Sequence, residues 1–172
     1  ALLMSPAQVT KDYFIVGSIS GSFLNMALVG TLCAALTFIP GTVVTGMTVT
    51  AFVLTMGFTT WGINILNIWP FILGVFLNAK LRKQPLSGSV NLAMFATGLC
   101  PVVSEMLFRY HVWNYYITYQ IQVSILGFIY VIIFSIFLGF TIPAMLPGAL
   151  KLHKGYNLYN GGLAFGLLGL FI

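Results

Sequence analysis

Asparagine side chains are rare in the long apolar stretches of this sequence, and they mark positions where binding chemistry can occur. Asn25, Asn64 and Asn67 interrupt the stretch from Tyr13 to Ala79, which contains no Asp, Glu, Lys, Arg or His. An amide offers both donors and an acceptor, so it needs polar partners in apolar surroundings. Asn64 and Asn67 lie three residues apart just before Pro70, which predicts one shared helix face. They either contact a polar solute or bridge neighbouring helices.

Glu105 and Arg109 form the second group of candidate functional residues, because charged side chains inside apolar segments often have a function. Their i, i+4 spacing places them on one helix face, with Glu before Arg, the favourable order for an ion pair. Three interpretations stay open. The pair lies at the level of the lipid headgroups beside His111, it gates or orients a substrate, or Glu105 is a proton-coupled carboxylate.

No motif in the sequence indicates catalysis or a metal site. Ser104 and Glu105 have no His on the same face, and no Gly-Lys-Ser/Thr pattern follows the glycines. Cys33 and Cys100 lie in apolar segments without a CxxC spacing, which predicts small buried thiols. We expect no enzymatic activity, no metal and no cofactor.

The composition places the chain among polytopic membrane proteins. Of its 172 residues, 59% are hydrophobic and 5% are charged. The net charge is +5, and five of the seven Lys and Arg residues form two groups, Lys80/Arg82/Lys83 and Lys151/Lys154. Two such groups are typical of cytoplasmic loops and not of a nucleic-acid-binding face. The predicted partners are therefore the lipid bilayer and a small-molecule solute. A homo-oligomer is compatible with the sequence, and the predicted location is the inner membrane of a bacterial cell.

Apolar segments and breakers divide the chain into predicted spans. Five lie at about 13–39, 42–59, 62–79, 88–107 and 115–140, and a sixth starts near 155. The first is either one tilted helix or a short half-helix followed by a full helix. We expect a break near Trp69-Pro70, an interruption at Gly98 and Cys100-Pro101, and a helix end at Pro143 and Pro147.

The second basic group and the two ends of the sequence give two further expectations. Lys151 to Lys154 are expected to form a loop after the fifth span. Because the chain starts at Ala1 and ends at Ile172 inside an apolar run, we expect a single transmembrane domain over residues 1–172 that belongs to a longer protein.

Two stretches of the sequence look alike. Asn25 to Gly30 and Tyr159 to Gly166 each contain an Asn followed by small residues, a Leu and a Gly, so Asn160 corresponds to Asn25. This pattern, together with Ile68-Trp69-Pro70-Phe71, resembles the urea-transporter family. That resemblance implies inverted repeats around a narrow pore for small, neutral, planar solutes. The whole chain also resembles an uncharacterised bacterial family of multi-spanning membrane proteins of unknown function.

These observations predict an all-α, polytopic helical bundle that forms part of an inverted-repeat channel or transporter with broken or re-entrant helices. The predicted function is passage of a small, neutral or weakly polar solute. The predicted solute path includes Asn25, Asn64, Asn67, Pro70 and Asn160. The alternative is a membrane scaffold or assembly subunit that transports nothing and uses its asparagines and glycines for helix packing.

Overall fold

The computed structural model describes residues 2–5, 12–108 and 125–153, and every regular element in these ranges is a helix. In chain order the elements are η1 (Leu2–Met4), α1 (Tyr13–Thr37), α2 (Gly46–Phe58), α3 (Trp69–Leu81), η2 (Leu86–Ser89), α4 (Val90–Ala96), η3 (Thr97–Leu99), α5 (Pro101–Phe108) and α6 (Ile125–His153). The predicted all-α class is confirmed.

Helix length separates the elements into two groups. Three segments are long and apolar enough to cross a membrane, namely Tyr13–Thr37, Leu86–Phe108 and Ile125–Met145. The apolar helices α2 and α3 have 13 residues each, or about 20 Å of helix. The hydrocarbon core of a bilayer is about 30 Å thick. The structure is that of an integral membrane protein, and the count of five spans stays a prediction.

Helix α1 contains a break close to its beginning. Asp12 caps the helix by accepting a hydrogen bond from the Phe14 N–H at 2.8 Å. The backbone then leaves the helical region at Ser18, which has φ 63° and ψ 165°. Of the two predicted forms of this segment, the structure has the short half-helix followed by a longer one. The helix ends at Thr37, and the chain turns before α2 at Gly41, which has φ +87°.

Helices α2 and α3 begin where local signals favour helix starts. Thr45 and Thr48 form a capping box at the start of α2. Pro70 lies in the first turn of α3, where a backbone N–H is not needed by the helix. The predicted third span is helical only from the expected break at Trp69-Pro70 onward, because the residues before α3 are not helical. The shared helix face predicted for Asn64 and Asn67 is therefore wrong.

The segment Leu86–Phe108 is built from four short helices in succession. The predicted interruption at Gly98 and Cys100-Pro101 is confirmed, since η3 (Thr97–Leu99) separates α4 from α5 and α5 begins at Pro101.

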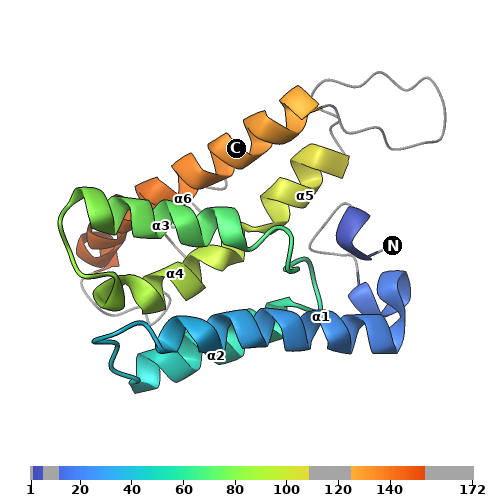
Figure 1. Ribbon diagram of the computed structural model, residues 1–172, viewed down its shortest axis with the longest axis horizontal. Coiled ribbons are helices and arrows are strands. Elements are labelled where there is room, and N and C mark those ends of the chain that lie inside the picture. Colours follow the sequence, from blue (N-terminus) through green and yellow to red (C-terminus); the bar gives the residue numbers. More distant parts are fainter. Residues whose placement is uncertain (1, 6–11, 109–124, 154–172) are drawn as a thin grey trace.

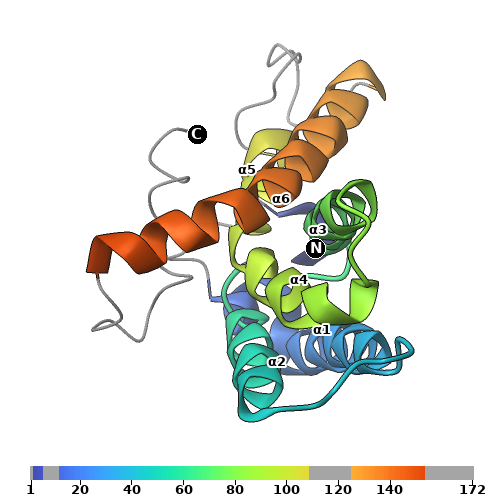
Figure 2. The same ribbon diagram turned by 90° about the vertical axis from the view of Figure 1, so that its left-hand side faces the viewer.

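The predicted helix end at Pro143 and Pro147 is wrong, because α6 continues to His153. Lys151 consequently lies in a helix and not in the expected loop. Figure 2 shows that α6 changes direction along its length, as proline-containing helices do. A membrane helix tolerates proline when other groups satisfy the carbonyls that the kink releases. The Asn78 amide of α3 donates at 2.8 Å to the Phe140 carbonyl, three residues before Pro143.

The helices pack as two pairs with α4 between them. Figure 1 and Figure 2 both show α1 beside α2 on one side of α4, and α3 beside α6 on the other. The buried core joins all of them and includes Val29, Ala51, Phe71, Met94 and Val131. Large apolar side chains such as Ile15, Val43, Val53 and Ile133 are exposed on the outside. An apolar outer surface suits contact with lipid.

Candidate functional site

The candidate site is the non-helical segment 59–68 between α2 and α3, which we call the linker. It turns sharply at Gly62, whose φ of +132° is accessible to glycine at little cost. Gly62, Ile63, Asn64, Asn67 and Ile68 are all buried. Non-helical backbone in a buried, apolar environment must find hydrogen-bond partners outside the helical pattern.

Asn25 supplies three of these bonds from α1. Its Nδ2 donates to the carbonyl of Thr59 at 3.2 Å and to that of Ile63 at 2.9 Å. Its Oδ1 accepts the N–H of Ile65 at 3.3 Å. The side chain is 4% exposed. One amide thus ties the end of α2 and the middle of the linker to α1.

Asn64 and Asn67 hold the linker from within. The Asn64 Oδ1 accepts the N–H groups of Leu66 at 2.9 Å and Asn67 at 3.1 Å. In return, the Asn67 Oδ1 accepts the Asn64 N–H at 2.9 Å, and its Nδ2 donates to the Gly62 carbonyl at 2.8 Å. This reciprocal arrangement is a local substitute for the missing helical bonds.

Two residues from other helices complete the network. The Asn64 Nδ2 donates to the Tyr13 hydroxyl oxygen at 3.3 Å, and the Asn67 Nδ2 donates to the Ser104 Oγ at 3.0 Å. The Tyr13 N–H also donates to the Thr60 carbonyl at 3.0 Å. The linker is therefore bonded to α1 and to α5 as well as to itself.

The network uses most of the hydrogen-bonding capacity of its amides. Both N–H groups of Asn25 and of Asn67 are engaged, and the Asn64 Oδ1 accepts two bonds. These are the bonds expected if the asparagines bridge helices, one of the two alternatives that the sequence left open. Contact between these amides and a solute would require one of the bonds to be exchanged, and that role stays a prediction.

The remaining predicted residues lie in different places. Pro70 is buried at the start of α3, directly after the linker. Glu105 is half-buried in α5, next to Ser104 and near enough to Tyr13 for a Coulombic interaction. Arg109 and Asn160 lie outside the described residues, so the Glu105–Arg109 pair stays a prediction. In the part of the chain that the structure describes, no three His, Cys, Asp or Glu residues gather to hold a metal.

Tyr13, Ser104 and Asn78 were missed by the sequence analysis. Tyr13 and Asn64 are separated by 51 residues, and Ser104 and Asn67 by 37, so no local pattern connects them. Asn78 has the same signal as the other asparagines, an amide inside an uncharged apolar stretch. That signal was sufficient to find it.

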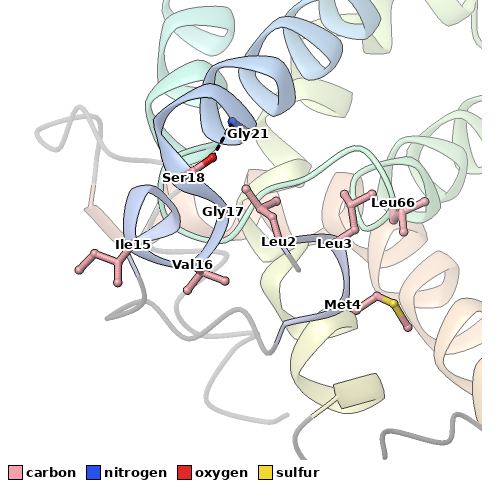
Figure 3. A pocket seen from close by; sticks show the side chains of 9 residues that line it. All are labelled: Leu2, Leu3, Met4, Ile15, Val16, Gly17, Ser18, Gly21 and Leu66. Carbon is pink, nitrogen blue, oxygen red and sulfur yellow. Dashed lines mark hydrogen bonds between the residues drawn. The ribbon is translucent and has the colours of Figure 1, made fainter.

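A pocket of about 780 Å³ lies where the break in α1 approaches the linker. Figure 3 shows Ile15, Val16, Gly17, Ser18 and Gly21 of α1 on one side, with Leu66 of the linker and the η1 residues on the other. The Leu2 side chain packs closely on Gly17, where an added Cβ would lie 2.6 Å from the Leu2 Cδ1. The pocket lining is mostly apolar, and the Ser18 Oγ accepts the Gly21 N–H at 3.4 Å.

Comparisons with known proteins give one match. No curated protein and no solved structure matches the chain. The resemblance to urea transporters therefore stays a prediction. The model of a family described as protein of unknown function (DUF1576) matches residues 1–172, in agreement with the predicted uncharacterised membrane family. The chain belongs to the DUF1576 family.

Proposed function

We propose that this protein provides a membrane path for a small, neutral or weakly polar solute, and that the path runs beside the linker. The observation that supports the proposal is a buried, non-helical backbone segment between two short apolar helices. In membrane proteins, such segments occur where they are enclosed by protein or line a cavity. Transporters place them at their binding sites.

The lengths of α2 and α3 support a turn of the chain inside the bilayer. Each helix measures about 20 Å, against about 30 Å of hydrocarbon. Asn25, which holds the linker, lies about 18 Å along α1 from Thr37. Gly41 before α2 and Ser87 after α3 lie close together, since a Cβ on Gly41 would be 3.3 Å from the Ser87 Oγ. We propose that the pair enters and leaves the membrane on the same side, as a re-entrant element.

The chemistry around the linker favours a neutral solute. The groups that bond the linker are amides, hydroxyls and backbone groups, all uncharged. Such groups can replace part of the hydration shell of a small polar molecule by exchanging hydrogen bonds. A multivalent ion would instead need charged or metal-ligating side chains around it.

A scaffold role is the second candidate. It is favoured because the asparagine amides already use most of their hydrogen-bonding capacity within the protein. If Asn25, Asn64 and Asn67 act only as hydrogen-bonding supports, the linker has a structural purpose and no solute passes. Measurement of solute movement separates these two functions.

The test is stopped-flow flux through proteoliposomes that contain the full-length protein, with urea, formamide, glycerol and ammonia as separate solutes. We expect flux above that of empty liposomes for at least one solute. Asn25→Leu should lower this flux about tenfold or more, since the linker loses three bonds at once. Asn91→Leu is the matched control, because Asn91 is half-buried in α4 and contributes none of these bonds.

Circular dichroism of the reconstituted variants should first show that their helices are retained. No flux of any of the four solutes, from folded wild-type protein, would contradict the path and favour the scaffold.

A further inference from the structure

The end of α3 carries a concentrated positive charge, which we call the basic turn and define as Lys80, Arg82 and Lys83. All three side chains are exposed. Leu81, which lies among them, is 66% exposed, and Leu86 after the turn is 39% exposed. Cations interleaved with exposed apolar side chains suit the boundary between the headgroups and the acyl chains of a bilayer.

The backbone of the basic turn is firmly held. The Gln84 N–H donates to the Ala79 carbonyl at 2.9 Å and the Lys83 N–H donates to the Lys80 carbonyl at 3.0 Å. These two bonds form a Schellman motif, in which the residue after the helix cap takes a positive φ and is usually glycine. Here that residue is Lys83, with φ 55°. The backbone therefore holds the three cationic residues close together at the end of α3.

The acidic residues of the chain cannot neutralise this turn. There are two, Asp12 and Glu105. Glu105 follows Ser104, which bonds the linker, and α3 separates the linker from the basic turn by about 20 Å. Asp12 begins α1, at the end that bonds the linker through Tyr13, and Figure 1 shows this end far from the end of α3. Charges separated by more than about 8 Å are largely screened at physiological salt.

We propose that the basic turn is a binding site for anionic phospholipid headgroups. The phosphate of the lipid would contact Lys80, Arg82 and Lys83, and its acyl chains would lie along Leu81. This inference is independent of solute passage. It also gives α3 an attachment at the point where the α2–α3 pair meets the membrane surface.

The structure provides a variant that separates charge from folding. Lys83→Gly removes one cation and places the preferred residue at a positive φ. It should weaken lipid binding and at the same time raise the melting temperature. A turn with only a structural role would not move these two readouts in opposite directions.

The test is native mass spectrometry of the full-length protein, titrated separately with phosphatidylglycerol and phosphatidylcholine. Each cation removed, by Lys80→Gln, Arg82→Gln or Lys83→Gly, should weaken phosphatidylglycerol binding about fivefold. Phosphatidylcholine binding should stay unchanged, and the Lys80→Arg/Lys83→Arg variant should bind phosphatidylglycerol as wild type does.

The triple variant carries Lys80→Gln, Arg82→Gln and Lys83→Gly together. Unchanged phosphatidylglycerol affinity in this variant, with its helical circular dichroism intact, would overturn the proposal. The Lys151→Gln/Lys154→Gln variant is the matched control for the second basic group of the sequence and should retain binding. Loss of binding in this control alone would also overturn the assignment to the basic turn.

Discussion

At the scale of single residues, three asparagines replace the helical hydrogen bonds that the linker lacks. Asn25 bonds two carbonyls and one N–H. The side chains of Asn64 and Asn67 each accept the backbone N–H of the other residue, and they donate to Tyr13 and Ser104, respectively. An unpaired polar group costs several kcal/mol in a medium without water. The asparagines are therefore part of the fold whether or not a solute ever meets them.

Removal of Asn67 tests this structural role. Asn67→Leu leaves the Gly62 carbonyl and the Asn64 N–H without their present partners. Each orphaned group costs about 1–3 kcal/mol, so we expect a loss of at least about 2 kcal/mol in the free energy of unfolding. Thermal unfolding in detergent measures the effect, with Asn91→Leu as the control that should change little. Equal melting temperatures for the two variants would contradict the role of Asn67.

The break in α1 gives a second prediction at this scale. Ser18 has φ 63° and ψ 165°, a conformation that glycine adopts far more readily than other residues. Ser18→Gly should raise the melting temperature relative to Ser18→Ala, which loses the Ser18 Oγ bond to the Gly21 N–H and keeps the unfavourable φ. A less stable glycine variant would show that α1 is not broken at this position.

The sequence identifies some of these residues and not others. Asn25, Asn64 and Asn67 stand out because an amide in an uncharged stretch is costly anywhere in the fold. Tyr13 and Ser104 do not stand out, because a hydroxyl is tolerated in many environments. Their importance depends on which helices are neighbours, and that is decided by contacts across many residues of chain.

At the scale of elements, the pairing of α3 with α6 depends on glycine. A Cβ added at Gly74 would lie 2.2 Å from the Ile136 carbonyl oxygen, and one added at Gly139 would lie 2.5 Å from that of Phe71. The two backbones therefore approach closely, as small residues permit between membrane helices. The Asn78 bond to the Phe140 carbonyl lies at the same crossing.

The close packing of α3 on α6 explains why α6 continues past its predicted end. Proline at 143 and 147 predicts a stop on local grounds. A partner helix changes the outcome, because α3 packs closely on α6 at Gly74 and its Asn78 amide donates to the Phe140 carbonyl just before Pro143. The identity of that partner is not contained in the local sequence of α6.

Gly74→Ala tests the close approach. The added methyl group meets backbone atoms that cannot rotate away, so we expect the two helices to separate at a cost of more than about 2 kcal/mol. Gly57→Ala in α2 is the matched control, since a Cβ there meets nothing within 4 Å. It should be neutral or stabilise by up to about 1 kcal/mol. Unfolding in detergent that shows the same small effect for both variants would contradict the crossing.

At the scale of the whole molecule, the α2–α3 pair has two possible arrangements in the membrane, and both leave the flanking loops on the same side. Whether the pair turns inside the bilayer or crosses twice, the loops at Gly41 and at the basic turn lie on one side. The helical class and the approximate positions of the elements follow from composition and breakers. The turn between α2 and α3 also follows from them, since the predicted spans 42–59 and 62–79 meet there. The bonds that hold the linker do not, because they come from residues of α1 and α5 that lie far away in the sequence.

Labelling with a membrane-impermeant maleimide tests this sidedness. Val43→Cys and Gln84→Cys, each at an exposed position, should react from the same side of sealed vesicles. The native Cys33 and Cys100 are buried and should give little background. Reaction of the two positions from opposite sides would contradict the arrangement of α2 and α3.

The depth of Trp61 tests the central claim, that the linker turns inside the bilayer, most directly. Trp61 lies in the linker and is 54% exposed, so its indole should contact lipid. In a variant of the full-length protein that keeps Trp61 and has every other tryptophan, including Trp69 and Trp113, replaced by Phe, lipids brominated at different depths would quench its fluorescence. We predict the strongest quenching by bromine near the bilayer centre. The strongest quenching by bromine next to the headgroups would contradict a re-entrant pair and show that α2 and α3 each cross the membrane.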